Sequence, residues 1–375
     1  ACGGCQLQHL DYPGQLAAKM DLVQESFQRY TGLKEIPLRP IAGMEYPWSY
    51  RNKAQWQLGT KNGRLAVGLY KPGSHQLVDL SDCPVQHSNT TYMLHETRNV
   101  LEALDIPPYN ERKRTGVVRT IIARYGFETG DAQLTFVTAT EHIPSVDKLI
   151  EELRKRLPEV TSIMQNVNPK KTPLIFGDRT KKLWGKTTLT EKIGPLSFHL
   201  SPRAFFQLNP IQTVKLYQFV QEAAALTGRE SVVDAYCGVG TIGTWLAPHA
   251  REIRGIETVP EAVEDARQNA RLNGITNARF FTGKAEVLLP QWVKQGFRPD
   301  VVVVDPPRSG CERPLLDALI HTKPDRLVYV SCNPSTLAKD CNILLKGGFR
   351  LQWVQPVDMF PHTAHVECCV LLTRK

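Results

Sequence analysis

The sequence predicts an α/β protein in which a doubly wound, mostly parallel sheet follows a smaller α+β domain with an antiparallel sheet. Three observations support this prediction. Helical and strand-like segments alternate from about residue 213 to the C-terminus. The strands there include continuous apolar runs such as VVVV at 301–304, which are typical of strands buried on both faces. Between about 46 and 140, short alternating runs separated by turn residues are typical of hairpins instead.

The first domain is placed at residues 1–200, with the boundary near 195–205. Apolar residues at helical spacing predict one helix over 15–30, and residues 145–157 predict a second helix lying on the sheet. The expected strands lie in the runs KAQWQLG, RLAVGLY, VVRTIIARYG and AQLTFVTAT.

The second domain is placed at residues 201–375 and begins with a helix over 213–226. The expected strands carry the runs SVVDA, IRGIETV, ARFFTGKA, DVVVVD, RLVYVS, LQWVQPVDMF and VECCVLLT. Helices are expected between them over 260–274, 315–322 and 334–348. This order is that of successive β-α-β units, which form parallel sheets.

Composition and charge bear on the partners and the location expected of this protein. The chain has 375 residues and a net charge of +9, and its 46 Lys and Arg residues permit a polyanionic partner without proving one. The densest basic stretch, at 165–190, could equally be a solvated face. No long apolar run or secretion signal is present, so neither a membrane span nor export is expected. With nine cysteines in no framework spacing, reduced thiols and a cytoplasmic location are expected.

A glycine turn and an acidic residue follow two neighbouring strands. Gly238 and Gly240 allow a tight turn and a close approach to a ligand. Glu257 ends the next strand, where a carboxylate can accept the two ribose hydroxyls of an adenosine cofactor. This pattern fits both a nicotinamide dinucleotide and S-adenosylmethionine (SAM), and a turn needed only for packing remains an alternative.

Two further strands end in residues that could take part in catalysis. Asp305-Pro-Pro-Arg308 suits a methyltransferase that presents a planar base to its methyl donor, although it could be a stiff loop alone. Cys332 would lie on the same rim, where a strand end and a helix N-terminus lower a thiol pKa and favour a nucleophile. The alternative is an inert buried cysteine.

The segment before the last strand contains His362, His365 and Glu367. The spacing H-x-x-H-x-E matches no usual catalytic zinc site. Glu367, at the mouth of a strand, is better placed to act as a general base.

A third group of residues concerns metal binding. Cys2 and Cys5 form C-G-G-C, and Cys83, followed by proline, is a candidate partner. Three thiolates are one short of a cubane iron–sulfur cluster, and zinc with a histidine (His9 or His87) is the alternative.

In order and together, these motifs resemble those of the SAM-dependent RNA uracil-5 methyltransferases, which make 5-methyluridine in 23S rRNA or in the tRNA T-loop. The resemblance covers nearly the whole chain and is carried by C-G-G-C at 2–5, YRNK at 50–53, FFQLN at 205–209, DAYCGVG at 234–240, DPPR at 305–308, SCNP at 331–334 and DMFPHTAHVE at 358–367. It implies a Rossmann-like catalytic domain at 201–375, and an RNA-binding domain at 1–200 whose helix within 10–38 packs on the catalytic domain.

The resemblance also implies roles for residues. Cys332 would be the nucleophile and Glu367 the general base, and the predicted SAM contacts are Gln207, Tyr236, Gly238, Gly240, Glu257 and Asp305. Cys2, Cys5 and Cys83 would be three ligands of a [4Fe–4S] cluster. Members with a cluster carry a further cysteine about six positions before C-G-G-C, so we expect this chain to lack its natural N-terminus and the cluster's fourth ligand.

The predicted partner is RNA, with 23S rRNA favoured over tRNA because of the C-G-G-C motif, and the protein is expected to be a monomer that binds neither DNA nor membranes. The rival functions are a tRNA T-loop methyltransferase, an exocyclic-amine methyltransferase, a non-catalytic RNA-binding iron–sulfur protein and a nicotinamide oxidoreductase.

Overall fold

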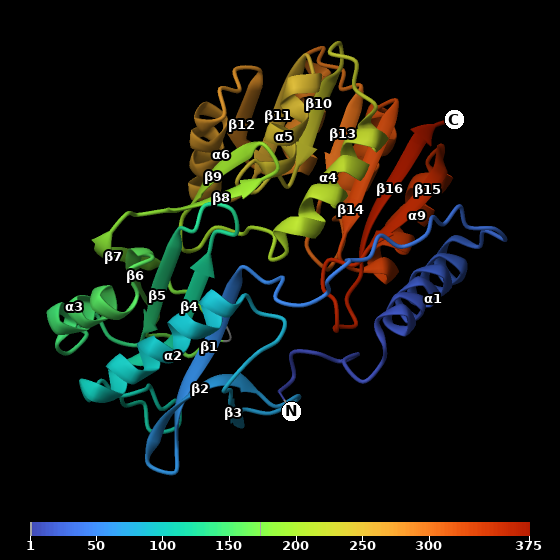
Figure 1. The fold of residues 1–375 in the computed structure, drawn as a ribbon. Coiled ribbons are helices and arrows are strands. Elements are labelled where there is room, and N and C mark those ends of the chain that lie inside the picture. The colour runs from blue at the N-terminus through green and yellow to red at the C-terminus, as the bar shows by residue number, and fades with distance from the viewer. Residues whose placement is uncertain (1, 173) are drawn as a thin grey trace.

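The computed structural model describes residues 2–172 and 174–375, and two seven-stranded sheets lie in the two halves of the chain (Figure 1). The first sheet has the order β3-β2-β1-β4-β5-β6-β7. Its strands are β1 (Lys53–Lys61), β2 (Arg64–Tyr70), β3 (Leu77–Asp79), β4 (Val118–Tyr125), β5 (Ala132–Thr138), β6 (Val160–Val167) and β7 (Arg179–Gly185). Helices α2 (Ser88–Ala103) and α3 (Val146–Arg156) cover one face of this sheet.

The first half differs from the sequence prediction in three ways. Strands β3, β6 and β7 lie outside the expected runs. Helix α2 was not predicted, because Thr90, Thr91 and Thr97 interrupt the apolar stripe of its buried face. The sheet is also not wholly antiparallel, since β5 and β6 are parallel and α3 connects them. A parallel pair requires such a crossover, so the predicted helix at 145–157 is the connection itself.

The second sheet has the order β12-β11-β10-β13-β14-β16-β15. Its strands are β10 (Ser231–Ala235), β11 (Glu252–Glu257), β12 (Ala278–Thr282), β13 (Val301–Val304), β14 (Arg326–Ser331), β15 (Phe349–Val357) and β16 (Glu367–Arg374). The first five strands are parallel, and β16 is antiparallel to both β14 and β15. This is the doubly wound, mostly parallel arrangement that the sequence predicted.

Helices cover both faces of the second sheet, so successive strand residues enter different cores. Val302 and Val304 belong to one core together with residues of α7 (Ala285–Lys294), α8 (Arg313–Thr322) and α9 (Pro334–Lys346). Val301 and Val303 belong to the opposite core together with α4 (Pro210–Ala224) and α5 (Thr241–Leu246), which η1 (Ala247–His249) continues. Helix α6 (Pro260–Leu272) packs beside β12 in a smaller cluster.

Helix α1 (Tyr12–Thr31) comes from the beginning of the chain but lies against the second half (Figure 1). The Asp11 side chain caps its first turn, and Gly32, in the left-handed conformation, ends it. Val23 and Phe27 are fully buried in the same core as α9.

The hairpin of β8 (Leu189–Ile193) and β9 (Leu196–Leu200) also packs on the second half, against α4 and α6, although the sequence-based boundary assigns it to the first domain. Within the described part of the chain, no helix has both the length and the apolar character needed to cross a bilayer.

Candidate active site

Three candidate residues leave their strands at one level of the second sheet. In the parallel pairs of β10, Ala235 lies opposite both Ile256 of β11 and Val304 of β13. The residues that follow are Tyr236, Glu257 and Asp305. They therefore share the carboxyl edge of the sheet, where ligands bind in doubly wound folds.

The glycine turn after β10 has no side chains at Gly238 and Gly240, so a ligand can come close to its backbone. Gly238 and Gly240 have φ values of +54° and +80°. The Gly238 N–H donates to Glu257 Oε2 at 3.2 Å, so the turn and the acidic residue are joined directly. A Cβ at Gly240 would lie 2.9 Å from the side chains of Ala266 and Phe280, so only glycine fits there without a shift.

A cavity of about 480 Å³ lies beside this turn, within the size range of small-molecule sites. Gly238 and Glu257 line it, together with Phe205, whose side chain is 72% exposed. The other lining residues come from three further segments: Asp178, Thr180, Ser201, Pro202, Arg203, Ala204, Val239, Val259, Glu261, Ala262 and Asp265. The cavity thus has an acidic group for hydroxyls and apolar and aromatic surface for a flat ring. Phe205 belongs to the FFQLN motif at 205–209, but no role was predicted for it.

The other predicted cofactor contacts lie outside the lining of this cavity. Gln207 is buried, and its carbonyl accepts a hydrogen bond from Asn52 at 3.2 Å, which joins the two halves of the chain. Tyr236 has a positive φ of +65°, unusual for a residue with a side chain. Asp305 is half-buried at the same edge of the sheet.

The predicted nucleophile and base are brought together by strand pairing. β14 and β16 are antiparallel, with Ser331 opposite Cys368. Cys332 follows Ser331 and Glu367 precedes Cys368, so the two residues stand opposite each other at the end of this pair. Cys332 is half-buried and Glu367 is 3% exposed.

The electrostatics of this group correct one prediction. Burial raises the pKa of Cys332, and the carboxylates of Glu367 and Asp305 act in the same direction. The expected lowering of the thiol pKa at this strand end is therefore wrong for the protein alone. Burial likewise raises the pKa of Glu367, and Asp305 raises it further because two like charges lie close together.

Arg308 is the cation that opposes these shifts, a role that was not predicted for it from the DPPR motif. Its charge lowers the pKa of both Cys332 and Glu367. Its Nη2 lies 3.3 Å from Nε2 of His365, whose pKa is lowered by burial. A neutral His365 can accept this hydrogen bond, so His365 lies beside the cation rather than binding a metal with His362.

Hydrogen bonds fix the loop that carries Arg308. Asn333, the N-cap of α9, donates to the Arg308 carbonyl at 3.0 Å. Farther along the loop, the Cys311 N–H donates to Asp340 Oδ2 at 2.8 Å, and the Tyr329 hydroxyl donates to the same oxygen at 2.6 Å. The residues after β13 and β14 are thereby held in one arrangement.

The cysteines proposed for a cluster are close enough to affect one another. Burial raises the pKa of Cys5, and Cys83 and Cys2 raise it further. Across residues 2–172 and 174–375, however, no group of three or more His, Cys, Asp or Glu side chains is arranged to hold a metal ion. The residues as placed do not fit the predicted [4Fe–4S] cluster, which stays a prediction.

Comparisons with known proteins identify the family to which the chain belongs. Residues 186–375 match the family model described as tRNA (uracil-5-)-methyltransferase. A Halalkalibacterium halodurans protein named as an uncharacterized RNA methyltransferase is 54% identical over 373 residues, which are 99% of this chain and 81% of that protein. A Bacillus cereus protein with the same description is 55% identical over 376 residues, covering 100% of this chain and 82% of the relative.

A solved structure extends the comparison to the fold. The crystal structure of Pyrococcus abyssi tRNA (uracil-54, C5)-methyltransferase in complex with S-adenosyl-L-homocysteine matches with a TM-score of 0.80 and 28% identity. The match covers 99% of this chain and 86% of that one, which confirms the predicted α/β methyltransferase fold. The chain therefore belongs to the tRNA (uracil-5-)-methyltransferase family and is a SAM-dependent RNA (uracil-5-)-methyltransferase.

Proposed function

We propose that this enzyme methylates carbon-5 of a specific uridine in 23S rRNA through a covalent bond between Cys332 and the uracil ring. The observation that carries the proposal is the pairing of β14 with β16, which sets Cys332 opposite Glu367 at the sheet edge shared with Asp305 and Glu257. A thiol and a carboxyl group at that edge supply both steps that carbon-5 methylation requires.

The chemistry begins with the nucleophile, because carbon-5 of uracil is too weakly nucleophilic to take a methyl group unaided. The Cys332 thiolate adds to carbon-6, and the ring electrons move to form an enolate. Carbon-5 then attacks the methyl group of SAM, forming a carbon–carbon bond as the carbon–sulfur bond of the sulfonium breaks. Glu367 takes the carbon-5 proton, the double bond re-forms, and Cys332 leaves as thiolate.

Two ionisable neighbours, Arg308 and Asp305, would assist these steps. Arg308 stabilises the thiolate and carboxylate forms of the pair, which burial alone disfavours. Burial raises the pKa of Asp305, so its protonated form could donate a hydrogen bond to the edge of the uracil.

SAM would occupy the cavity lined by Phe205, Gly238 and Glu257. Glu257 would accept the ribose hydroxyls, and the exposed Phe205 ring would cover the adenine. Gly240 lets the backbone turn closely, and Gln207, Tyr236 and Asp305 would contact the remainder of the cofactor. When bound, SAM supplies the electrophilic methyl group.

The choice of RNA depends on separate observations. The 23S rRNA proposal rests on the C-G-G-C motif, whose thiols lie near Cys83. A tRNA T-loop uridine is the second candidate, favoured by the whole-chain similarity to a structure titled as a tRNA (uracil-54, C5)-methyltransferase. Tritium release from [5-³H]uridine in 23S fragments and in tRNA transcripts compares the two directly. Release from tRNA transcripts alone would overturn the rRNA proposal.

The covalent step is tested by trapping. RNA containing 5-fluorouridine cannot lose a proton from carbon-5, so wild-type enzyme with SAM should accumulate a denaturant-resistant protein–RNA band. Cys332→Ala should give no band, while its affinity for SAM stays within a few fold of wild type. Cys341→Ala, which removes a buried thiol of α9 that has no proposed role, is the control and should trap normally. Trapping by Cys332→Ala would refute the nucleophile assignment.

The base is tested with ordinary RNA. Glu367→Gln should allow addition and methyl transfer but stall elimination, so that the adduct accumulates without fluorouridine. A variant that turns over at the wild-type rate would remove Glu367 from the mechanism.

The cluster prediction has its own test. Iron and acid-labile sulfide should be measured in anaerobically purified protein that includes any residues preceding this sequence. Iron at well below one atom per chain would remove the cluster.

A further inference from the structure

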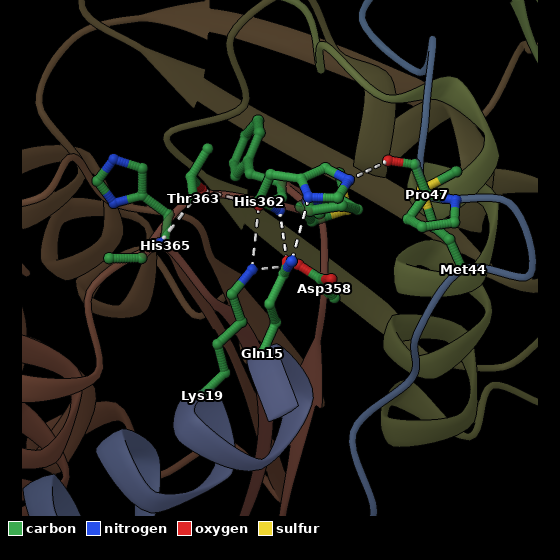
Figure 2. Close-up of polar contacts among 12 residues, drawn as sticks. Gln15, Lys19, Met44, Pro47, Asp358, His362, Thr363 and His365 are labelled. Atoms are coloured by element: carbon green, nitrogen blue, oxygen red, sulfur yellow. Dashed lines mark hydrogen bonds and ion pairs between the residues drawn. The ribbon is translucent and has the colours of Figure 1, made fainter. Parts of the chain in front are cut away.

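A buried ion pair joins α1 to the connection between β15 and β16 (Figure 2). Lys19 Nζ lies 2.6 Å from Asp358 Oδ1, and the two side chains are 1% and 0% exposed. The same ammonium group donates to the Phe360 carbonyl at 3.0 Å, and the Tyr12 hydroxyl donates to Asp358 Oδ2 at 2.9 Å. Both carboxylate oxygens therefore have a donor from α1.

One turn earlier on α1, Gln15 forms hydrogen bonds with His362 in the middle of the same connection. Its Oε1 accepts from the His362 N–H at 2.8 Å, which fixes the orientation of the amide. Its Nε2 then faces His362 Nδ1 at 3.1 Å, so Nδ1 is the acceptor and the ring proton is on Nε2. That proton points to the Pro47 carbonyl at 3.0 Å (Figure 2). The ring also stacks on Trp48, with ring centroids 3.7 Å apart.

The connection does not hold this shape through regular structure of its own. His362 has a φ of +67°, a conformation that a residue with a Cβ adopts only when its surroundings require it. Further bonds to this segment also come from outside it: the Tyr50 hydroxyl donates to the Pro361 carbonyl, and the Leu7 N–H to the His362 carbonyl. The connection leads directly into Glu367, the first residue of β16.

Apolar contacts also hold α1 against the second half. Val23 and Phe27 already bury the helix against α9, and Ser26 lies 3.4 Å from Ser335 of that helix. A buried ion pair is commonly no more stabilising than a well-packed apolar pair of the same size. A buried ion pair differs from an apolar pair in its geometry, because the charges and their hydrogen-bond partners accept few alternative arrangements.

We propose that Lys19 and Gln15 are positioning residues that set the β15–β16 connection and thereby aim the Glu367 carboxyl group at carbon-5 of the bound uridine. The proposal rests on the proposed function, because it assigns these residues to the proton-removal step. Neither residue touches the reactants. The initial addition by Cys332, which is carried by β14 and α9, should depend on them much less.

The test separates addition from elimination in Lys19→Met and Gln15→Leu. With fluorouridine RNA, both variants should form the covalent adduct within a few fold of the wild-type rate. With ordinary RNA, both should resolve the adduct more slowly, because misplacing a catalytic group by about 1 Å costs on the order of 100-fold. KM for RNA should change far less than kcat.

Two controls distinguish positioning from general damage. Val23→Ala removes apolar contact on the same helix and should lower Tm without changing the rate of adduct resolution. Lys19→Met combined with Asp358→Asn removes both charges and should resolve the adduct faster than Lys19→Met alone. If Lys19→Met does not fold, Gln15→Leu still decides, because it leaves the buried Lys19–Asp358 pair intact.

The outcomes are distinct from those that test the proposed function. If wild-type enzyme forms no adduct with fluorouridine RNA, the covalent mechanism fails and this inference fails with it. If wild-type enzyme forms the adduct but Gln15→Leu and Lys19→Met resolve it at the wild-type rate, the positioning role alone is overturned.

Discussion

The hydrogen bond from Tyr329 to Asp340 allows a quantitative prediction for the loop that carries Arg308. Tyr329 is fully buried on β14, and its hydroxyl donates at 2.6 Å to a carboxylate oxygen that also accepts from Cys311 at 2.8 Å. Tyr329→Phe deletes this donor and only one heavy atom, so almost no cavity forms. The variant therefore measures the hydrogen bond rather than packing.

The expected loss follows from the charge on the acceptor. A hydrogen bond to an ionised group contributes about 1.5–3 kcal/mol to stability, so Tyr329→Phe should lower the free energy of unfolding by about 2 kcal/mol at pH 8. Burial raises the pKa of Asp340, and the Tyr329 bond lowers it. Removing the bond raises the folded-state pKa further, so the variant loses stability relative to wild type as pH rises. At pH 5, where more of the carboxyl is protonated, the loss should approach the roughly 1 kcal/mol of a neutral bond.

Urea unfolding of the full chain, followed by circular dichroism at pH 5 and pH 8, measures both values. In an Asp340→Asn background the acceptor is neutral at both pH values, so Tyr329→Phe should cost about 1 kcal/mol at each. A loss below about 0.5 kcal/mol at pH 8, or equal losses at both pH values in the Asp340 protein, would refute the reasoning.

Three further predictions concern activity and binding. Because burial and Asp305 raise the pKa of Glu367, and the proposed base acts when deprotonated, kcat should keep rising with pH above neutrality. Arg308→Gln removes the positive charge that opposes this shift and should move the rise of kcat to higher pH. A kcat that no longer rises above pH 6.5 in the wild-type enzyme would contradict both predictions. Phe205→Ala should weaken SAM binding on the order of tenfold by calorimetry, since its ring lines the cavity, and an unchanged Kd would exclude it from the site. Lys171→Ala with Lys182→Ala should reduce the salt slope of RNA binding by about 1–2; an unchanged slope would mean that these lysines form a solvated face.

The sequence alone predicts the second half well because its information is local. Each strand such as 301–304 is a continuous apolar run, and the polar residue that follows it falls at the sheet edge. Strand ends of one parallel sheet meet at one edge, so Glu257, Asp305 and Cys332 could be grouped before their distances were known.

What the sequence does not predict is non-local or electrostatic. Helix α2 lacks a regular apolar stripe, and its burial depends on strands elsewhere in the chain. The Lys19–Asp358 pair joins positions 339 residues apart, and neither residue has a local signal for it. The raised pKa of Cys332 comes first from burial and then from the carboxylates of Glu367 and Asp305, which β16 and β13 bring close.

The packing of α1 on α9 also has a consequence for biosynthesis. Helix α1 is translated before the second half of the chain, and Lys19 meets Asp358 only after 339 further positions have been translated. At roughly 5–20 residues per second, that interval lasts on the order of 20–70 s. During it, the apolar side of a nascent helix carrying Val23 and Phe27 has no native surface to cover it, which makes this segment a natural target for chaperones.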